Sequence, residues 1–154
     1  MSSHFADALI EIFDETLTTH HGIFLDKGTS MMETLATISA EEASQPVSAS
    51  CASIAAQVNH TTYYLDVLRR ELRGQEIGPV DWNQAWTIGP VTTAEWNDLV
   101  TRLRTTAGKI LDMVRSTNTW EEDPSWAAAA ITVHTAYHLG EIRQAICTIQ
   151  NRPA

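Results

Sequence analysis

The chain has 154 residues, a formal net charge of −9 and 44% hydrophobic residues, which is typical of one globular domain, here residues 1–154, with a single core. Its acidic charge and dispersed Lys and Arg residues argue against nucleic-acid binding, which requires clustered cations. It has no apolar run of membrane-spanning length, no basic signal-peptide start and two cysteines, so we expect a cytoplasmic protein without membrane partners or a disulfide framework.

The first part of the chain is expected to be helical. Apolar residues recur at helical spacing over residues 3–18, and a second helical stretch follows over residues 24–38. His20, His21 and Gly22 interrupt this pattern, which leaves open one kinked helix or two. We interpret the adjacent histidines as a solvated turn, with an additional metal ligand as the alternative. Residues 39–49 then form a predicted loop with one helical turn at 40–43.

The next helix is predicted over residues 51–73, with Ser50 as its N-cap and Gly74 at its end. His60 lies in its middle, on a face that we expect to point into the protein. The other residues of that face are small or polar more often than large and aliphatic: Ser53, Ala56, Gln57, Tyr64 and Val67. This helix therefore brings a histidine into a roomy, partly polar interior.

Residues 74–91 are too long for an ordinary turn between bundle helices. An extended crossover of this length can return along a whole helix, which allows the helices before and after it to run parallel. Residues 81–86 are expected to form a short helix that covers one end of the bundle. We interpret Trp82 and Trp86 as packing residues of this lid, with a platform for substrate as the alternative.

The third long helix is predicted from Thr92 to about residue 116, because Thr92 and Glu95 match the capping-box pattern. A short loop at residues 117–123 then makes the fourth helix an antiparallel neighbour. Asp123 and Pro124 are expected to start this fourth helix, which extends to about residue 149. No alternating strand pattern occurs, so the fold class is all-α: a four-helix bundle with a long crossover between its second and third helices.

The fourth helix carries the residues that point to chemistry. His134 and His138 are four residues apart, which places both imidazoles on one helix face, as two metal ligands on a helix require. His60 from the facing helix is the candidate third ligand, and three imidazoles leave coordination positions open, as in catalytic sites. Such ligands suit zinc, nickel, copper or iron(II). Glu141 is a candidate acceptor for an imidazole N–H or general base, with an exposed carboxylate as the alternative.

Cys51 and Cys147 are not expected to reach this site. Each lies nine residues from His60 or His138, which is about half a turn around its helix. We interpret both as small buried or half-buried thiols.

With these two histidine segments, the chain resembles the DinB-like superfamily of metalloenzymes. The resemblance rests on His60 within residues 57–60 and on His134 and His138 within residues 134–144, where Gly140 and Gln144 also fit. It implies an up-down-down-up four-helix bundle in which His60, His134 and His138 bind the metal. It also implies thiol-dependent transferases and isomerases among the relatives, and frequent homodimers.

The leading hypothesis is a metal-dependent enzyme, with zinc or nickel as the expected ion, that transfers a low-molecular-weight thiol to a small electrophilic substrate. A metal-dependent hydrolase or isomerase is an alternative. The alternative from another class is a non-catalytic binding or dimerisation module, whose histidines are hydrogen-bonded inside a polar cavity. In either class we expect a homodimer, for which exposed apolar residues of the first helix are candidate contacts.

Overall fold

The computed structural model of the chain describes residues 3–117 and 122–151. Within these ranges it is all-α, as predicted, and contains no β-strand. No helix in the described part of the chain combines the length and the hydropathy needed to cross a bilayer. The elements are α1 (Ser3–Leu17), α2 (Met31–Leu35), α3 (Ala40–Ser44), α4 (Ile54–Leu72), the 3-10 turn η1 (Gln84–Trp86), α5 (Thr93–Arg115) and α6 (Glu122–Gln150).

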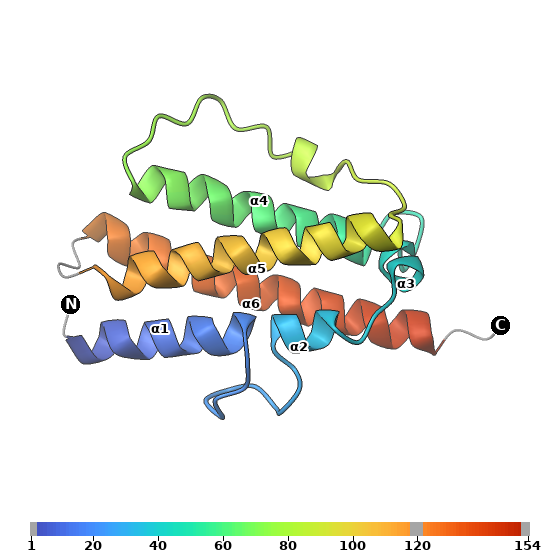
Figure 1. Ribbon diagram of the computed structural model, residues 1–154, viewed down its shortest axis with the longest axis horizontal. Coiled ribbons are helices and arrows are strands. Elements are labelled where there is room, and N and C mark those ends of the chain that lie inside the picture. Colours follow the sequence, from blue (N-terminus) through green and yellow to red (C-terminus); the bar gives the residue numbers. More distant parts are fainter. Residues whose placement is uncertain (1–2, 118–121, 152–154) are drawn as a thin grey trace.

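The long helices α1, α4, α5 and α6 lie side by side as a bundle, and α2 roughly continues the line of α1 (Figure 1). The segment 73–92 leaves α4 at one end of the bundle and returns over the outside to the other end, where α5 begins. As a result α4 and α5 run in the same direction, while α1 and α6 run in the opposite one. Both α4 and α1 contact α6, which places α6 between segments that are far apart in the sequence.

The core is apolar, and each of the α-helices contributes to it. In α5 the apolar residues recur at helical spacing and are buried on one face, because a 3.6-residue repeat places them on one stripe. Fully buried large side chains come from all parts of the chain: Leu17, Met31, Leu35, Ile54, Leu65, Leu103, Ile110, Ile131, Leu139 and Ile142. This core fixes α4 against α6, the two helices that carry the candidate site.

The helix starts follow local hydrogen bonds. The predicted capping box of Thr92 and Glu95 is confirmed, and Ser30–Glu33 and Ser39–Glu42 form two more. The predicted cap at Ser50 is wrong, because Ser53 caps α4 by accepting a hydrogen bond from the Ala56 N–H. Residues 48–51 form a turn instead, in which the Cys51 N–H donates to the Ser48 carbonyl.

The prediction of a helix over residues 24–38 is wrong for its first seven and its last three residues, because α2 begins at Met31 and ends at Leu35. For the first seven residues the cause is Glu15, which is fully buried at the end of α1. Its carboxylate accepts hydrogen bonds from the backbone N–H groups of residues 21–24, at 2.7–3.0 Å. These donors hold an irregular loop, in which Gly22 adopts a φ of +82°. The turn at residues 40–43 is confirmed, as part of α3.

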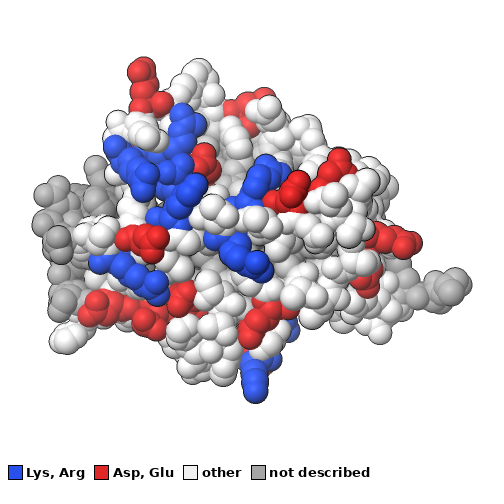
Figure 2. All heavy atoms as spheres, in the orientation of Figure 1, with Lys and Arg blue, Asp and Glu red and all other residues white. Residues whose placement is uncertain are grey.

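Most of the predicted loop 117–123 and the side chains of the predicted Asp123–Pro124 cap lie outside the described residues, although α6 is assigned from Glu122 onward. On the face shown in Figure 2, basic side chains gather toward the end of α4, with acidic side chains beside them. The sequence of that end contains Arg69, Arg70 and Arg73.

Candidate metal centre

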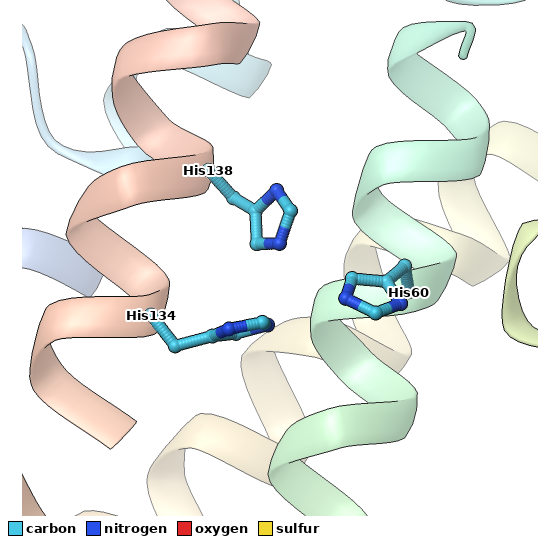
Figure 3. Close-up of side chains that lie close together, drawn as sticks. All are labelled: His60, His134 and His138. Carbon is cyan, nitrogen blue, oxygen red and sulfur yellow. The ribbon is translucent and has the colours of Figure 1, made fainter. Parts of the chain in front are cut away.

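The bundle brings the three predicted histidines together. His60 lies in the middle of α4, and His134 and His138 lie one turn apart on the facing side of α6. Figure 3 shows the three rings converging on the space between these helices, and one ring nitrogen from each lies within 4.8 Å of the others. His60 and His138 are buried and His134 is half-buried. Three imidazoles from two separated segments thus share one interior point.

The three imidazoles can serve as ligands of one metal ion. Each ring offers one nitrogen to the cluster, and these nitrogens lie within 4.8 Å of one another. A tetrahedral ion with metal–nitrogen distances of about 2.1 Å would bring such nitrogens to about 3.4 Å from one another. Buried polar atoms in proteins are nearly always hydrogen-bonded, yet His60 Nδ1 and His134 Nε2 are buried and have no hydrogen-bond partner among the described residues.

His138 is oriented by two acceptors on its other side. Its Nδ1 lies 2.9 Å from Gln57 Oε1 and 3.0 Å from Glu141 Oε2. Because a carboxylate oxygen can only accept, we assign the ring proton to Nδ1, which leaves the lone pair of Nε2 free. The other Glu141 oxygen accepts a hydrogen bond of 2.7 Å from the Tyr137 hydroxyl. Glu141 thus holds one imidazole in the tautomer that a metal ligand needs.

Aromatic rings fix the planes of the other two histidines. Trp86 stacks on His60, with ring centroids 3.9 Å apart and an interplanar angle of 16°. Tyr64 stacks on His134, with centroids 3.6 Å apart and an angle of 20°. Trp86 comes from η1, and the Asn59 side chain holds this turn to α4 by donating a 2.9 Å hydrogen bond to the Ala85 carbonyl. The crossover therefore supplies part of the site.

The electrostatics keep the histidines neutral. Burial, together with the neighbouring His138, lowers the pKa of His60 to about 4, although Glu141 opposes this shift. Burial and the other two histidines lower the pKa of His134 to about 4. Burial also lowers the pKa of His138, against the opposing effect of Glu141. Neutral imidazoles carry the lone pairs that a metal binds, so the site is ready for a cation at neutral pH.

Comparison with known proteins identifies the family. The family model of the DinB superfamily matches residues 25–142 of the sequence.

The chain belongs to the DinB superfamily.

The match includes His60, His134, His138 and Glu141. No curated protein and no solved structure matches the chain.

A cavity of about 480 Å³ in this DinB-superfamily protein is lined by residues that contact His60 and His138, and none of the three histidines is among its lining residues. Gln57 and Glu141, which contact His138, and Trp86, which stacks on His60, all line it. The remaining lining residues are small, apolar or uncharged: Val47, Cys51, Ala52, Gly140, Gln144, Ala145 and Thr148. A small molecule in this cavity would lie next to the residues that orient two of the three imidazoles.

Other residues considered from the sequence lie elsewhere. His21 is exposed, with its ring nitrogens 3.3 Å from carboxylate oxygens of Glu11 and Asp14. Among the described residues, the metal-ligand cluster contains neither His20 nor His21. Trp82 packs against Tyr63 and Tyr64, and Tyr64 in turn stacks on His134.

The prediction of buried or half-buried thiols is wrong, because Cys51 and Cys147 are both exposed. Cys51 also lines the cavity. Cys51 precedes α4 instead of lying within it, so the helical spacing from His60 does not determine where Cys51 lies.

Sequence reasoning missed two contacts. It placed Gln57 on the same face as His60 without recognising it as a partner of His138. It also missed Tyr137, although its spacing of four residues from Glu141 is the usual signal for a side-chain pair on a helix. The stacking of Trp86 on His60 joins residues 26 positions apart, and it carries no signal in a single sequence.

Proposed function

We propose that this protein is a metal-dependent enzyme acting on a small molecule, with His60, His134 and His138 as ligands of one divalent cation. The observation that carries the proposal is the convergence of three imidazoles from α4 and α6, each with one nitrogen within 4.8 Å of the others. A non-catalytic polar cavity would be expected to hold its imidazoles by hydrogen bonds, since each unsatisfied buried group costs about 1–3 kcal/mol, yet His60 Nδ1 and His134 Nε2 have no partner among the described residues. The three-imidazole set favours zinc or nickel.

The specific reaction that we propose is the transfer of a low-molecular-weight thiol to an electrophilic carbon. The cation would supply positive charge that lowers the pKa of a thiol or water at the site. The thiol gives its proton to water, its sulfur forms a bond to the carbon, and the leaving group departs with the electrons of the broken bond. Trp86 forms an apolar wall for the substrate, and Gln57 and Glu141 keep His138 in place.

Glu141 also supports a second reaction class, hydrolysis or isomerisation. Its carboxylate lines the cavity, within reach of a bound small molecule, and a carboxylate there can accept a proton as a general base. Both of its oxygens already accept hydrogen bonds from the protein. We therefore assign it first as a positioning residue for His138.

Metal analysis of the protein purified without a histidine tag tests the proposal. We expect about one zinc or nickel ion per chain in the wild type and loss of this ion in His134→Ala, with far-UV helicity retained. His4→Ala removes an exposed histidine of α1 and serves as the matched control, which should keep the ion. Stoichiometric metal in His134→Ala would contradict the ligand assignment.

Activity assays then separate the reaction classes. The metal-loaded protein is incubated with small electrophiles in the presence and absence of low-molecular-weight thiols. Product formation that depends on both metal and thiol supports the transferase, and thiol-independent turnover of esters or amides supports a hydrolase. Bound metal without turnover in either assay would favour the non-catalytic alternative.

A further inference from the structure

A second cavity lies between α4 and α5. Its volume is about 350 Å³, and its lining residues come only from residues 59–66 of α4 and residues 101–109 of α5. It shares no lining residue with the cavity that Gln57 and Trp86 line. Each helix contributes residues over about two turns, so the cavity extends about 10 Å along the helices. This size suits a small organic molecule. We call it the α4–α5 cavity.

Two cationic side chains line the α4–α5 cavity without a charged partner. Arg102 and Lys109 are seven residues apart, which places them on one face of α5, about two turns from each other. Among the described residues neither of them forms an ion pair, whereas Arg69 and Arg115 do. Both side chains are long enough to meet at a group that is bound between them. They can therefore direct two positive charges at one anionic group of a ligand.

The charge around the α4–α5 cavity also favours an anion. Seven of the ten Lys and Arg residues of the chain lie in residues 69–115, which contain only six of the 19 Asp and Glu residues. The acidic lining residue, Asp66, already pairs with Arg69 at 2.6 Å, which compensates its charge. This region is thus basic within a protein whose net charge is −9, and it attracts an anion locally.

The remaining lining groups suit a phosphorylated molecule that carries hydroxyl groups. Tyr63 and four threonines line the cavity, and their hydroxyls can donate to phosphoryl oxygens. The Arg102 guanidinium presents paired N–H groups, whose spacing matches two oxygens of a phosphoryl group. Asn59 and Asp66 have side-chain oxygens that can accept hydrogen bonds from the hydroxyl groups of the same ligand. A strand of nucleic acid fits less well, because it needs a continuous row of cations.

We propose that the α4–α5 cavity binds a small organic phosphate, with its phosphoryl group at Arg102 and Lys109. The bound molecule contacts two residues that hold the crossover. Asn59 donates a hydrogen bond to the Ala85 carbonyl, and Tyr63 packs against Trp82. Binding therefore stabilises the segment of the crossover that includes η1. The proposal does not depend on a metal at the histidine cluster, since none of the three histidines lines this cavity.

Isothermal titration calorimetry tests the site with glycerol phosphate, a hexose phosphate, a nucleoside monophosphate and inorganic phosphate as probes. We expect at least one of the organic phosphates to bind with a dissociation constant below ~1 mM. Inorganic phosphate should bind at least ~10-fold more weakly, because it offers no hydroxyl groups of an organic part to Asn59 and Asp66. No binding of any organic phosphate, or equal affinity for inorganic phosphate, would overturn the proposal.

Variants then locate the phosphoryl group. Arg102→Gln and Lys109→Gln should each weaken binding of the best probe at least ~10-fold, with far-UV helicity retained. Arg104→Gln removes the same charge from an exposed position of α5 outside the α4–α5 cavity, and it should bind as the wild type. His134→Ala should also bind as the wild type. Equal losses in Arg102→Gln and Arg104→Gln would show only general attraction of anions and would overturn the site.

Hydrogen exchange with the best probe bound tests the position independently. We expect slower exchange over residues 82–88, because the ligand contacts Asn59 and Tyr63, and we expect no such change in Arg102→Gln. Slower exchange confined to residues 47–52 and 140–148 would place the phosphate in the cavity that Gln57 and Trp86 line. Loss of binding in His134→Ala with wild-type affinity in Arg102→Gln would place it at the histidine cluster. Either result would overturn the proposal.

Discussion

At the scale of single residues, the site depends on which nitrogen of each imidazole is free. In His138, Nδ1 donates to oxygens of Glu141 and Gln57, so Nε2 is the free nitrogen and is directed toward the cluster. In His60 and His134, the buried Nδ1 and Nε2, respectively, have no hydrogen-bond partner among the described residues. The histidine positions could be predicted because His60, His134 and His138 lie on interior faces of two helices. Gln57 and Glu141 could be placed on the correct helix faces from the sequence. Their hydrogen bonds to His138 could not be predicted, because these bonds depend on side-chain rotamers.

Glu141→Gln should weaken metal binding without removing it. The amide is the same size but carries no charge, so it polarises the His138 imidazole less. We expect an affinity loss of about 10–100-fold, the usual effect of a changed partner of a ligating histidine. Competition with a chromophoric chelator measures it. Gln144→Glu, which alters the charge of the same cavity without touching His138, is a useful comparison. Unchanged affinity in Glu141→Gln, with a large loss of turnover, would assign Glu141 as a general base instead.

At the scale of elements, polar side chains anchor two of the irregular segments that the structure describes. The crossover 73–92 is fixed near the site by Asn59, and the loop after α1 is fixed by Glu15. The long helices could be predicted from periodicity, because their core residues repeat every 3.6 positions. The loop after α1 could not, because its apolar residues fit a helical repeat and the hydrogen bonds that override this repeat come from a carboxylate six to nine residues earlier.

Asn59→Ala should loosen η1 and with it the Trp86 contact to His60. The variant removes one hydrogen bond and leaves the Ala85 carbonyl without that donor, so we expect about 1–2 kcal/mol of lost stability in urea unfolding. Hydrogen exchange should accelerate over residues 82–88, while α4 and α5 remain protected. Asn97→Ala, on the exposed face of α5, is the control. Wild-type exchange in the crossover of Asn59→Ala would show that other contacts hold it.

Glu15→Gln should destabilise the loop after α1. Burial alone raises the pKa of Glu15, but four backbone N–H groups outweigh it and lower the pKa to about 2. A neutral amide cannot replace a carboxylate that accepts all four, so we expect the melting temperature to fall by ~5 °C or more. The carboxylate contributes stability above pH ~4.5 that is lost as the pH falls toward ~2, and this acid dependence should shrink in the variant. Asp7→Asn, on the exposed face of α1, should behave as the wild type.

At the scale of the whole molecule, the histidine cluster couples stability to pH. Unfolding returns each histidine to a pKa of about 6.5, whereas folding lowers the pKa of His60 and His134 to about 4. The unfolded chain therefore binds more protons between these values. By linkage, the metal-free protein has the full contribution of the cluster above pH ~6.5 and loses it as the pH falls toward ~4.

Denaturant unfolding of the metal-free protein at pH 8, 6.5, 5.5 and 4.5 measures this effect. We expect little change between the first two conditions and a progressive loss below them, with uptake of about two protons per molecule on unfolding near pH 5. His60→Gln should reduce the uptake by about one proton. A stability profile that stays flat between pH 6.5 and 4.5 would show that the cluster is accessible to protons in the folded state.

The proposed ligands of the cation and the cavity residue Trp86 lie on different parts of the chain. The imidazoles belong to two helices of the core, where a substitution destabilises the fold. Trp86 belongs to the crossover 73–92, which runs over the outside of the bundle. This segment can vary in length and composition with little effect on the stability of the helices beneath it. Replacing the crossover 73–92 is therefore the simplest way to change the small-molecule specificity of the same bundle.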